Sequence, residues 1–411
     1  MLLSCGSNSF AHLALGHNED VSTFTPTLNL PPGEITDLVS VSAHTLLLVR
    51  HQDRNTLYGI GTNTVGQLGR KCALRDEDDK QVLDGWRRLS LVQEVDEEIS
   101  GDWAPIKIGA TWTTSFVVYR RSSSDEGSDQ GAEEMVIACG SNDFNELGYT
   151  DPTTFTTAPV TTASPPRVVD VGLKRGDRVE HLAYGQRHVM LVISDLEGEQ
   201  RIVGWGAGRR GEFDLSTLGG NEVDIGTRKG KGKAVARPTT YPPTTLRLPL
   251  ESDERIVDIS LGASHTLVLT SRKRVLAWGS NQKGQITSTA SLSNITQISA
   301  SWGGSYLTST NELLSQGSNI YSQLLHISDG RAPIRLPDGW QVEKVIAGSE
   351  HLICLLSHGG EEEVRVGGWN EHGNLGLGDQ VDRSELTRVD LTPGRIRGIW
   401  GGCASTWIWV E

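Results

Sequence analysis

The sequence contains few cysteines, and their spacing excludes two common stabilising devices. The five cysteines are Cys5, Cys72, Cys139, Cys354 and Cys403, and none of them forms a Cys-x-x-Cys pair. An odd number of cysteines at such spacing fits neither a disulfide framework nor a zinc site. We therefore expect reduced thiols, with Cys5 and Cys139 at a repeated, buried strand position.

Long hydrophobic runs are also missing. No window approaches eighteen consecutive apolar residues, so no membrane-spanning helix is expected. The start, MLLSCGSNSFAHL, lacks the basic region and the long apolar stretch of a secretory leader. We expect a soluble intracellular protein, located in the cytoplasm and the nucleus.

Positive charge is scarce, because the net charge is −13. Phosphate binding depends on clustered Lys and Arg, so direct DNA binding is not expected. One basic run stands at Arg228, Lys229, Lys231, Lys233 and Arg237. It is interpreted either as a solvated mobile loop or as a contact for tRNA or another phosphate group.

Catalytic motifs are absent from the sequence. There is no Gly-x-Ser-x-Gly elbow, no His-Glu-x-x-His helix and no phosphate loop ending in Gly-Lys-Ser/Thr. The glycines of Gly204–Gly208 are not followed by a predicted helix that could bind phosphate. We therefore expect no enzymatic activity, no cofactor and no bound metal.

Glycine and tryptophan are abundant, with 47 and 11 copies, and they occur in a repeated pattern. A strand followed by a turn such as Cys-Gly-Ser-Asn recurs seven times, which favours an all-β repeat fold. The anchoring glycines are Gly6, Gly61, Gly140, Gly206, Gly279, Gly317 and Gly368. Between them lies a second motif, Gly-x-x-His-Thr followed by an apolar strand, as in ISLGASHTLVLT.

These two motifs resemble the regulator-of-chromosome-condensation repeat over essentially the whole chain. The resemblance implies one domain over residues 1–411, a seven-bladed β-propeller with four-stranded blades. The strand Leu2 to Cys5 is expected to pair with the strand Trp400 to Val410 and so close the ring. Three insertions, 70–105, 120–135 and 209–255, are expected to be loops, and the Ser- and Glu-rich stretch Ser122 to Glu134 is expected to be disordered.

Histidine and tryptophan both recur at repeated positions, where each could have a structural or a functional role. His44, His188, His265 and His351 share one column with Trp112, Gly304 and Ser405. This mixture favours structural histidines over a metal-binding or proton-transferring ring. Trp205, Trp278, Trp400, Trp407 and Trp409 are interpreted as blade packing, because the repeated Gly-Trp-Arg-His-Thr array of the ultraviolet-B photoreceptor branch is missing.

Partner binding is predicted at the rim formed by the Gly-x-x-His-Thr turns. Most of these turns carry small residues, whereas Gln186, Arg187, Trp302 and Glu350 are larger or charged. Trp302 lies between small residues, so no side chain is expected beside it. It either forms an interface hot spot or folds inward to fill the funnel.

The start of the chain resembles a branch of this family, the fungal α-tubulin suppressors, also called killer-toxin-insensitivity proteins. The carrying residues are Gly6-Ser7-Asn8 and Leu13 to Asp20, with Ala14 in place of the usual glycine. The resemblance implies a scaffold that forms a heterodimer with a small zinc-ribbon, iron-binding electron carrier. Such a pair supports Elongator-dependent modification of the tRNA wobble uridine and diphthamide synthesis. The alternative is a guanine-nucleotide exchange factor for a Ran-like small GTPase.

Overall fold

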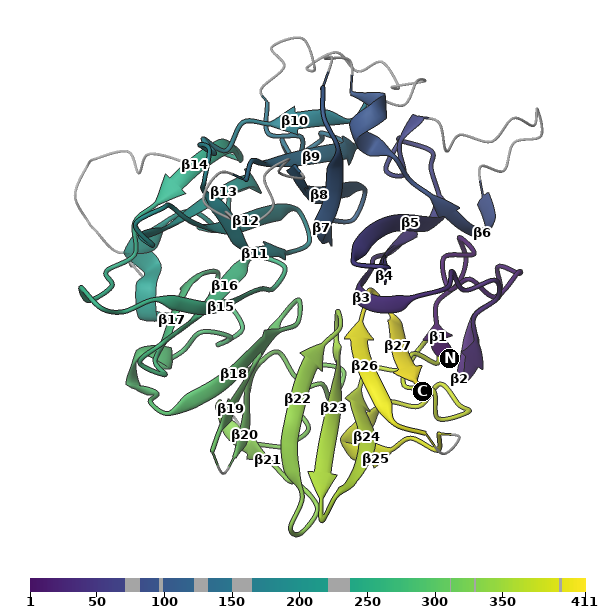
Figure 1. Cartoon of the computed structure of the whole chain (residues 1–411). Coiled ribbons are helices and arrows are strands. Elements are labelled where there is room, and N and C mark those ends of the chain that lie inside the picture. Colours follow the sequence, from purple (N-terminus) through teal and green to yellow (C-terminus); the bar gives the residue numbers. More distant parts are fainter. Residues whose placement is uncertain are drawn as a thin grey trace.

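The strands form seven antiparallel sheets arranged around a central axis like the blades of a propeller (Figure 1). This computed structural model describes residues 1–70, 82–95, 99–121, 132–149, 165–220, 237–310, 312–328, 330–391 and 394–411. Within these residues, six sheets have four strands and one has three. The predicted all-β, seven-bladed propeller is confirmed.

Each blade runs outward from the axis in chain order. The first, innermost strands are β3 (Glu34–Ser40), β7 (Trp103–Ala110), β11 (Arg178–Tyr184), β15 (Ile256–Leu261), β18 (Ile295–Ala300), β22 (Gln341–Ala347) and β26 (Ile396–Gly401). The second strands are β4 (His44–His51), β8 (Thr114–Arg121), β12 (His188–Ser194), β16 (His265–Thr270), β19 (Gly304–Ser309), β23 (His351–His358) and β27 (Ser405–Val410). The third strands are β5 (Arg54–Thr62), β9 (Glu134–Gly140), β13 (Gln200–Ala207), β17 (Val275–Gly279), β20 (Leu313–Gly317), β24 (Glu361–Gly368) and β1 (Leu2–Gly6). The fourth strands are β6 (Val82–Arg88), β10 (Arg167–Val169), β14 (Thr240–Leu246), β21 (Ala332–Ile334), β25 (Arg383–Arg388) and β2 (Val21–Pro26).

The anchoring glycine is the last or next-to-last residue of the third strand in each blade, at a place where no side chain fits. All seven glycines have a positive φ, between 97° and 127°. A Cβ added to Gly140 would lie 2.2 Å from the carbonyl oxygen of Thr113. A Cβ on Gly317 would lie 2.3 Å from the carbonyl oxygen of Gly303. Only glycine allows the third strand to approach the start of the second strand so closely.

An asparagine shapes the loop that follows this glycine. In six blades its side-chain oxygen accepts a hydrogen bond of 2.7–2.9 Å from the backbone nitrogen five residues later. These residues are Asn8, Asn63, Asn142, Asn281, Asn319 and Asn370. The repeat therefore fixes the shape of a loop as well as a strand end.

The repeated histidines connect neighbouring blades. The Nε2 atom of His44 lies 2.8 Å from Ser115 Oγ, and His265 and His351 make equivalent 3.0 Å contacts with Ser305 and Thr406. Burial lowers the pKa of these three imidazoles to between about 3 and about 4, so they are neutral. The structural interpretation is confirmed for these three. The ring nitrogens of His188 have no hydrogen-bond partner within the described residues.

The two ends of the chain build one blade together. Strand β1 pairs with β27 from Leu2 opposite Trp409 to Gly6 opposite Ser405. Leu2 and Leu3 are buried in this blade. The predicted closure of the ring by its terminal strands is confirmed.

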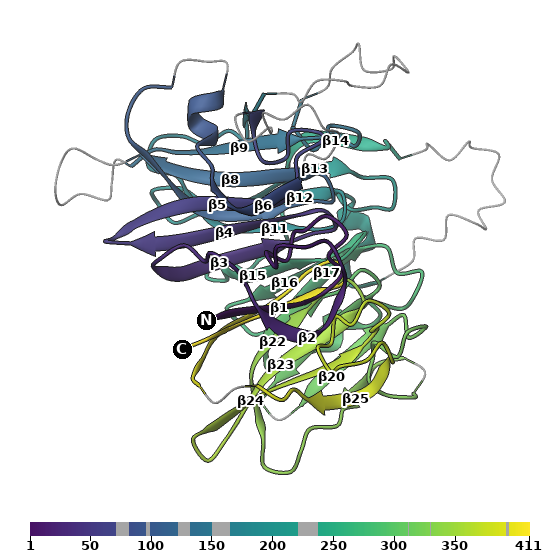
Figure 2. The same ribbon diagram turned by 90° about the vertical axis from the view of Figure 1, so that its right-hand side faces the viewer.

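The propeller has two distinct faces (Figure 2). We call the face that carries both termini and the hairpins between second and third strands, such as His51–Arg54, the terminal face. The opposite face carries the turns between first and second strands together with the glycine-asparagine loops, and we call it the turn face. The first strands therefore run from the terminal face to the turn face.

Part of the expected loops is regular structure instead. Residues 70–105 contain β6 and a 3-10 helix, η2 (Leu91–Glu94), because Leu89 and Leu91 are buried. Residues 209–255 contain η4 (Leu215–Gly220) and β14, and a third 3-10 helix is η5 (Thr289–Ser291). The prediction of loops was wrong for these segments. They contain the short fourth strands β6 and β14, which the neighbouring charged residues made difficult to recognise.

The remaining insertion predictions fall partly outside the described residues. Ser122–Gly131 and the basic run from Arg228 to Lys233 lie outside them. Glu134, expected in a disordered stretch, begins β9 and is buried, with its carboxylate 2.7 Å from Arg120 Nη2. Arg237 is ion-paired with Asp214 at 2.8 Å.

The hydrophobic core is divided into clusters, mostly between adjacent blades. Trp205, Trp278 and Trp407 are fully buried, and Trp400 and Trp409 are partly buried against such a cluster, as predicted. The thiols of Cys5 and Cys139 are buried at equivalent positions, also as predicted, whereas Cys72 lies outside the described residues. In the described part of the chain, no helix is long and apolar enough to span a membrane.

Candidate protein-binding face

The candidate site is the ring of turns between first and second strands, which surrounds the axis on the turn face. The turns comprise residues 41–43, 111–113, 185–187, 262–264, 301–303, 348–350 and 402–404. Hydrogen bonds connect neighbouring turns. The backbone nitrogen of Trp302 donates to the carbonyl oxygen of Ser349 at 2.8 Å, and that of Trp112 donates to the carbonyl oxygen of Gln186 at 3.2 Å. The ring of turns is therefore a continuous, ordered surface.

Trp302 lies in the turn between β18 and β19 and is half-buried. Its ring meets the ring of Trp112 nearly edge to face, with centroids 5.9 Å apart and an interplanar angle of 84°. The two residues belong to blades three positions apart in the ring of seven. Side chains from such distant blades can meet only across the axis.

The structure corrects two predictions about the turns. Trp302 was expected to have no neighbouring side chain, but it packs against Trp112. Trp112 was placed in the histidine column, but Thr114 is the residue that pairs with the anchoring Gly140. The predicted alignment of this blade was two residues too early, because Gly109 was taken for the turn glycine, whose position is occupied by Thr111.

Arg187 is held by two aromatic rings. Its guanidinium carbon lies 5.2 Å from the centroid of Trp112 and 4.0 Å from that of Phe144. Such cation–π contacts contribute about 0.5–2 kcal/mol, depending on burial. Gln186 lies beside it and bonds to the Trp112 backbone.

Glu350 lies on the blade next to Trp302. Its Oε2 atom accepts a 2.7 Å hydrogen bond from Gln323 Nε2. Burial raises the pKa of this carboxyl to about 7, against the smaller opposing effect of the Gln323 bond. The structure thus places all four predicted residues in turns of the turn face, with Arg187 and Trp302 joined through Trp112.

Sequence reasoning missed the aromatic residues of the outer loops. Tyr321 lies 5.9 Å from Trp369, and Trp369 lies 5.3 Å from His372, measured between ring centroids. Ile320 is 70% exposed and Phe10 is 42% exposed on the same kind of loop. The sequence could have indicated Phe10, Ile320 and Tyr321, because they occupy the two positions after a motif asparagine, where other repeats carry residues such as Ser, Thr or Gln.

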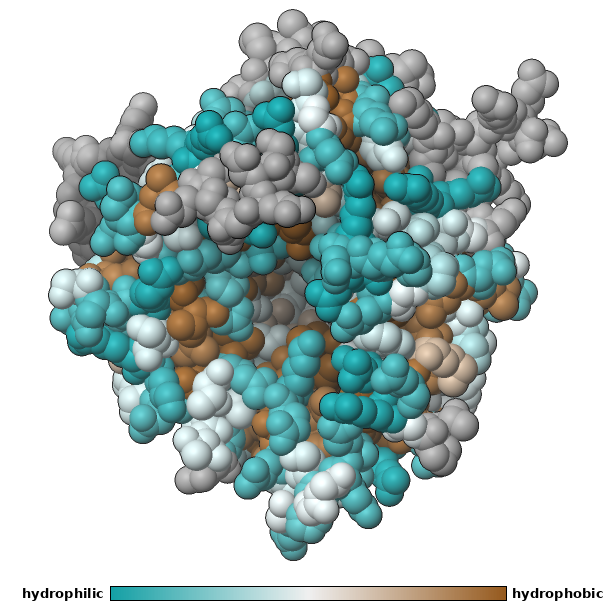
Figure 3. All heavy atoms as spheres, viewed as in Figure 1, coloured by the Kyte–Doolittle hydropathy of each residue, from teal (hydrophilic) through white to brown (hydrophobic). Residues whose placement is uncertain are grey.

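The terminal face has a different character. Ion pairs such as Arg50–Glu34, Arg54–Asp102 and Arg272–Asp253 occupy its hairpins. Figure 3 looks onto this face, where many hydrophilic side chains surround a central hollow. Exposed ion pairs contribute little binding energy, so the aromatic turn face is the better candidate for a protein interface.

Comparison with known proteins agrees with this architecture. The model of the Regulator of chromosome condensation (RCC1) repeat matches residues 256–285, which span β15 to the loop after β17. An RCC1 repeat-containing protein of Schizosaccharomyces pombe is 25% identical, over 100% of this chain and 99% of that protein. The secretion-regulating guanine nucleotide exchange factor of Bos taurus is 24% identical, over 93% of this chain and 76% of the relative.

The fold has a solved counterpart in Prp20p of Saccharomyces cerevisiae, whose structure was described together with its binding to Gsp1p and histones. The TM-score is 0.68 at 20% identity, over 99% of this chain and 90% of that chain. The class of the molecule is thus a closed seven-bladed β-propeller. Its repeats resemble the regulator of chromosome condensation (RCC1) repeat, whose model matches residues of one blade.

Proposed function

We propose that this propeller is a protein-binding scaffold without catalytic chemistry, and that its partner docks on the turn face. The observation that carries the proposal is the cluster of Trp112, Trp302, Arg187 and Phe144 on the turn face. Tryptophan and arginine in a partly desolvated centre are the residues that most often dominate protein interfaces. Acidic Glu350 on the same face adds a polar contact.

For the partner, we propose a small zinc-ribbon, iron-binding electron carrier. Through it the scaffold would act in Elongator-dependent modification of the tRNA wobble uridine and in diphthamide synthesis, in the cytoplasm and the nucleus. The support is the segment from Gly6 to Asp20, which resembles the fungal α-tubulin suppressors. Its last residues, Gly16 to Asp20, are exposed. This segment begins at the turn face, beside the candidate site.

A small GTPase is the second candidate, supported by the name of the bovine relative. Isothermal titration of the purified chain against a zinc-ribbon protein and against a nucleotide-free Ran-like GTPase separates the two. Tight binding to the zinc ribbon alone supports the first candidate, and tight binding to the GTPase alone supports the second. Failure of both partners to bind would overturn the assignment of partner class.

The docking face is tested separately with Trp302→Ala. We expect partner affinity to fall at least about tenfold, equivalent to about 1.4 kcal/mol, with little change in melting temperature. Leu196→Ala is the matched control, since Leu196 is 60% exposed in a hairpin of the terminal face. Unchanged affinity in the Trp302 variant would refute the site, and a large loss of thermal stability would assign Trp302 to the core.

A further inference from the structure

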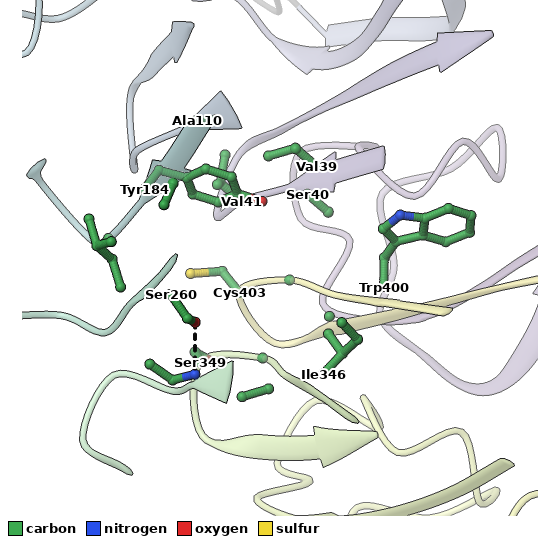
Figure 4. Close-up of a pocket in the computed structure, with 18 of the residues that line it drawn as sticks. Val39, Ser40, Val41, Ala110, Tyr184, Ser260, Ile346, Ser349, Trp400 and Cys403 are labelled. Atoms are coloured by element: carbon green, nitrogen blue, oxygen red, sulfur yellow. Dashed lines mark hydrogen bonds between the residues drawn. The ribbon is translucent and has the colours of Figure 1, made fainter. Parts of the chain in front are cut away.

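Side chains that line the axial cavity hold neighbouring blades together. The cavity has a volume of about 440 Å³, and Ser260 lies in its wall (Figure 4). The hydroxyl oxygen of Ser260 accepts a 3.0 Å hydrogen bond from the backbone nitrogen of Ala300 in the next blade. The hydroxyl oxygen of Ser299 accepts a 2.8 Å bond from the backbone nitrogen of Ala347, one blade further on. The blades that begin with β18 and β22 therefore present their outer loops in fixed relative positions.

Three neighbouring loops on the turn face combine aromatic side chains with negative charge. They follow the third strands β20, β24 and β1 of consecutive blades and comprise residues 317–328, 368–382 and 6–20. We call this surface the three-loop patch. It contains no Lys or Arg, and its carboxylates are those of Glu19, Asp20, Glu371, Asp379 and Asp382.

Contacts between side chains connect the three loops to one another. The ring centroid of Tyr321 on the first loop lies 5.9 Å from that of Trp369 on the second. The ring of Trp369 lies 5.3 Å from the ring of His372, measured between centroids. The Nδ1 atom of His372 lies 2.7 Å from Oδ2 of Asp20 on the third loop. The patch is therefore continuous over three blades.

Much of the patch is exposed, and part of its charge is not neutralised. Ile320 is 70% exposed and Tyr321 is 38% exposed. Glu19 and Glu371 are also exposed and, in the described part of the chain, take part in no ion pair. Among the same residues, no Lys or Arg lies over the rings of Tyr321 and Trp369. Exposed apolar side chains bordered by polar and charged groups are typical of an interaction surface.

Another pair of blades shows what such a loop can bind. Phe144 occupies the same loop position as Tyr321, two residues after the motif asparagine. The guanidinium carbon of Arg187 lies 4.0 Å from the centroid of the Phe144 ring. Arg187 comes from the next blade, where it directly precedes the repeated histidine His188. The aromatic ring of this loop is thus covered by an arginine of the same chain.

At the three-loop patch, a carboxylate replaces this arginine. Glu350 takes the position of Arg187 in the repeat, directly before the histidine. Its Oε2 atom accepts a 2.7 Å bond from Gln323, whose Oε1 atom accepts a 2.8 Å bond from the backbone nitrogen of Tyr321. The backbone nitrogen of Trp369 donates to the carbonyl oxygen of Glu350 at 3.0 Å. Two aromatic rings here therefore have a carboxylate on the neighbouring turn and no arginine of their own chain.

We propose that the three-loop patch binds an arginine-containing peptide segment of another protein. A guanidinium group of the segment lies over Tyr321 and Trp369 and pairs with Glu350. Further arginines contact Glu19 and Glu371. Arginine suits this surface better than lysine, because its planar guanidinium stacks on aromatic rings and pairs with a carboxylate through two parallel hydrogen bonds. The proposal does not depend on the zinc-ribbon partner, since a flexible segment of any protein can carry such a sequence.

The test is fluorescence anisotropy of a labelled peptide of alternating arginine and glycine, titrated with the full chain. The measurement is made at pH 8, where the Glu350 carboxyl, with its pKa of about 7, is mostly ionised. A salt concentration of about 150 mM screens unspecific attraction to the acidic chain. We expect saturable binding, and weaker binding when lysine replaces arginine. Citrulline keeps the shape of arginine without its charge and should weaken binding at least about tenfold.

Two variants locate the site on the chain. Tyr321→Ala and Glu350→Gln should each weaken binding of the arginine peptide about tenfold with a preserved melting temperature. Tyr321 is exposed, and a glutamine at position 350 can still hydrogen-bond to Gln323. Glu361→Gln is the matched control for the loss of one charge, since Glu361 is exposed in a hairpin of the terminal face. It should bind the peptide like the wild type.

Absence of binding by the arginine peptide would overturn the proposal, as would equal affinity for the lysine or the citrulline peptide. Wild-type affinity in both patch variants would do the same, and so would an equal loss in Glu361→Gln. If one patch variant fails to fold, the other variant and the citrulline peptide still decide the question. Neither a zinc ribbon nor a GTPase is present in these titrations, so failure here leaves the proposed function intact.

Discussion

Leu3 in the first strand pairs with Ile408 in the last strand, so a single ladder between the chain ends closes the ring of blades. Leu2 and Leu3 are 1% and 3% exposed, and each strand residue from Leu2 to Gly6 has a partner in β27. The closing blade therefore depends on five residues at the start of the chain.

Deletion of Met1 to Cys5 is expected to lower the stability of the whole ring. The truncated chain would leave β27 and β2 without their central partner and expose the apolar contacts of two leucines, which costs at least a few kcal/mol. Thermal melting followed by circular dichroism measures the effect. A truncated protein with an unchanged transition would show that the ring is closed in another way.

The anchoring glycines give a sharper test of the repeat. Gly140→Ala is expected to destabilise by about 2 kcal/mol or more, because its Cβ would meet the Thr113 carbonyl oxygen at 2.2 Å and its φ is 127°. Gly85→Ala is the matched control, since a Cβ there would have no atom within 4 Å. Urea unfolding of both variants compares them. Equal midpoints would contradict the close approach of the strands.

The number of blades and the closure of the ring could be predicted, because each depends on residues with one physical role. A glycine with positive φ and an apolar strand beside it leave the same signature in every repeat. The register of the second blade could not be predicted in this way. Gly109 and Thr111 made the turn ambiguous, and only the pairing of Thr114 with Gly140 resolves it.

The candidate site could be predicted only in part, because the repeat reveals unusual residues but not their contacts. Trp302, Arg187, Gln186 and Glu350 could be chosen as exceptions among small turn residues. The packing of Trp302 on Trp112 could not be predicted. It joins blades far apart in the chain and depends on how closely the turns approach one another around the axis. The fourth strands were missed because their outer position allows charged residues, as in the segment from Val82 to Arg88.

The contact between Trp112 and Trp302 is expected to couple two distant blades. Edge-to-face aromatic pairs contribute about 0.5–1.5 kcal/mol beyond the area they bury. A double-mutant cycle with Trp112→Leu and Trp302→Leu should therefore give an interaction energy in this range. Urea unfolding of the four proteins provides it. Strictly additive effects would mean that the two rings do not stabilise each other.

The buried histidines should make stability depend on pH in a defined direction. Burial lowers the pKa of His351 from 6.5 to about 4, so the folded protein holds this ring neutral where the unfolded chain protonates it. The stability that this histidine contributes is complete above pH 6.5 and is lost as the pH falls toward 4. The buried carboxyls Asp37 and Glu350, whose pKa values are raised to about 6 and about 7, act in the opposite direction in part of this window.

The histidine effect is therefore best measured as a difference between two proteins. In His351→Gln an amide replaces the ring and has no proton to gain, while it can still hydrogen-bond to Thr406. We expect this variant to be less stable than the wild type at pH 7, because the ring also packs on Gly348. Between pH 7 and pH 5, its free energy of unfolding should fall by about 2 kcal/mol less than that of the wild type. Urea titrations of both proteins at the two pH values give the difference directly, and parallel losses would show that His351 does not change its protonation on unfolding.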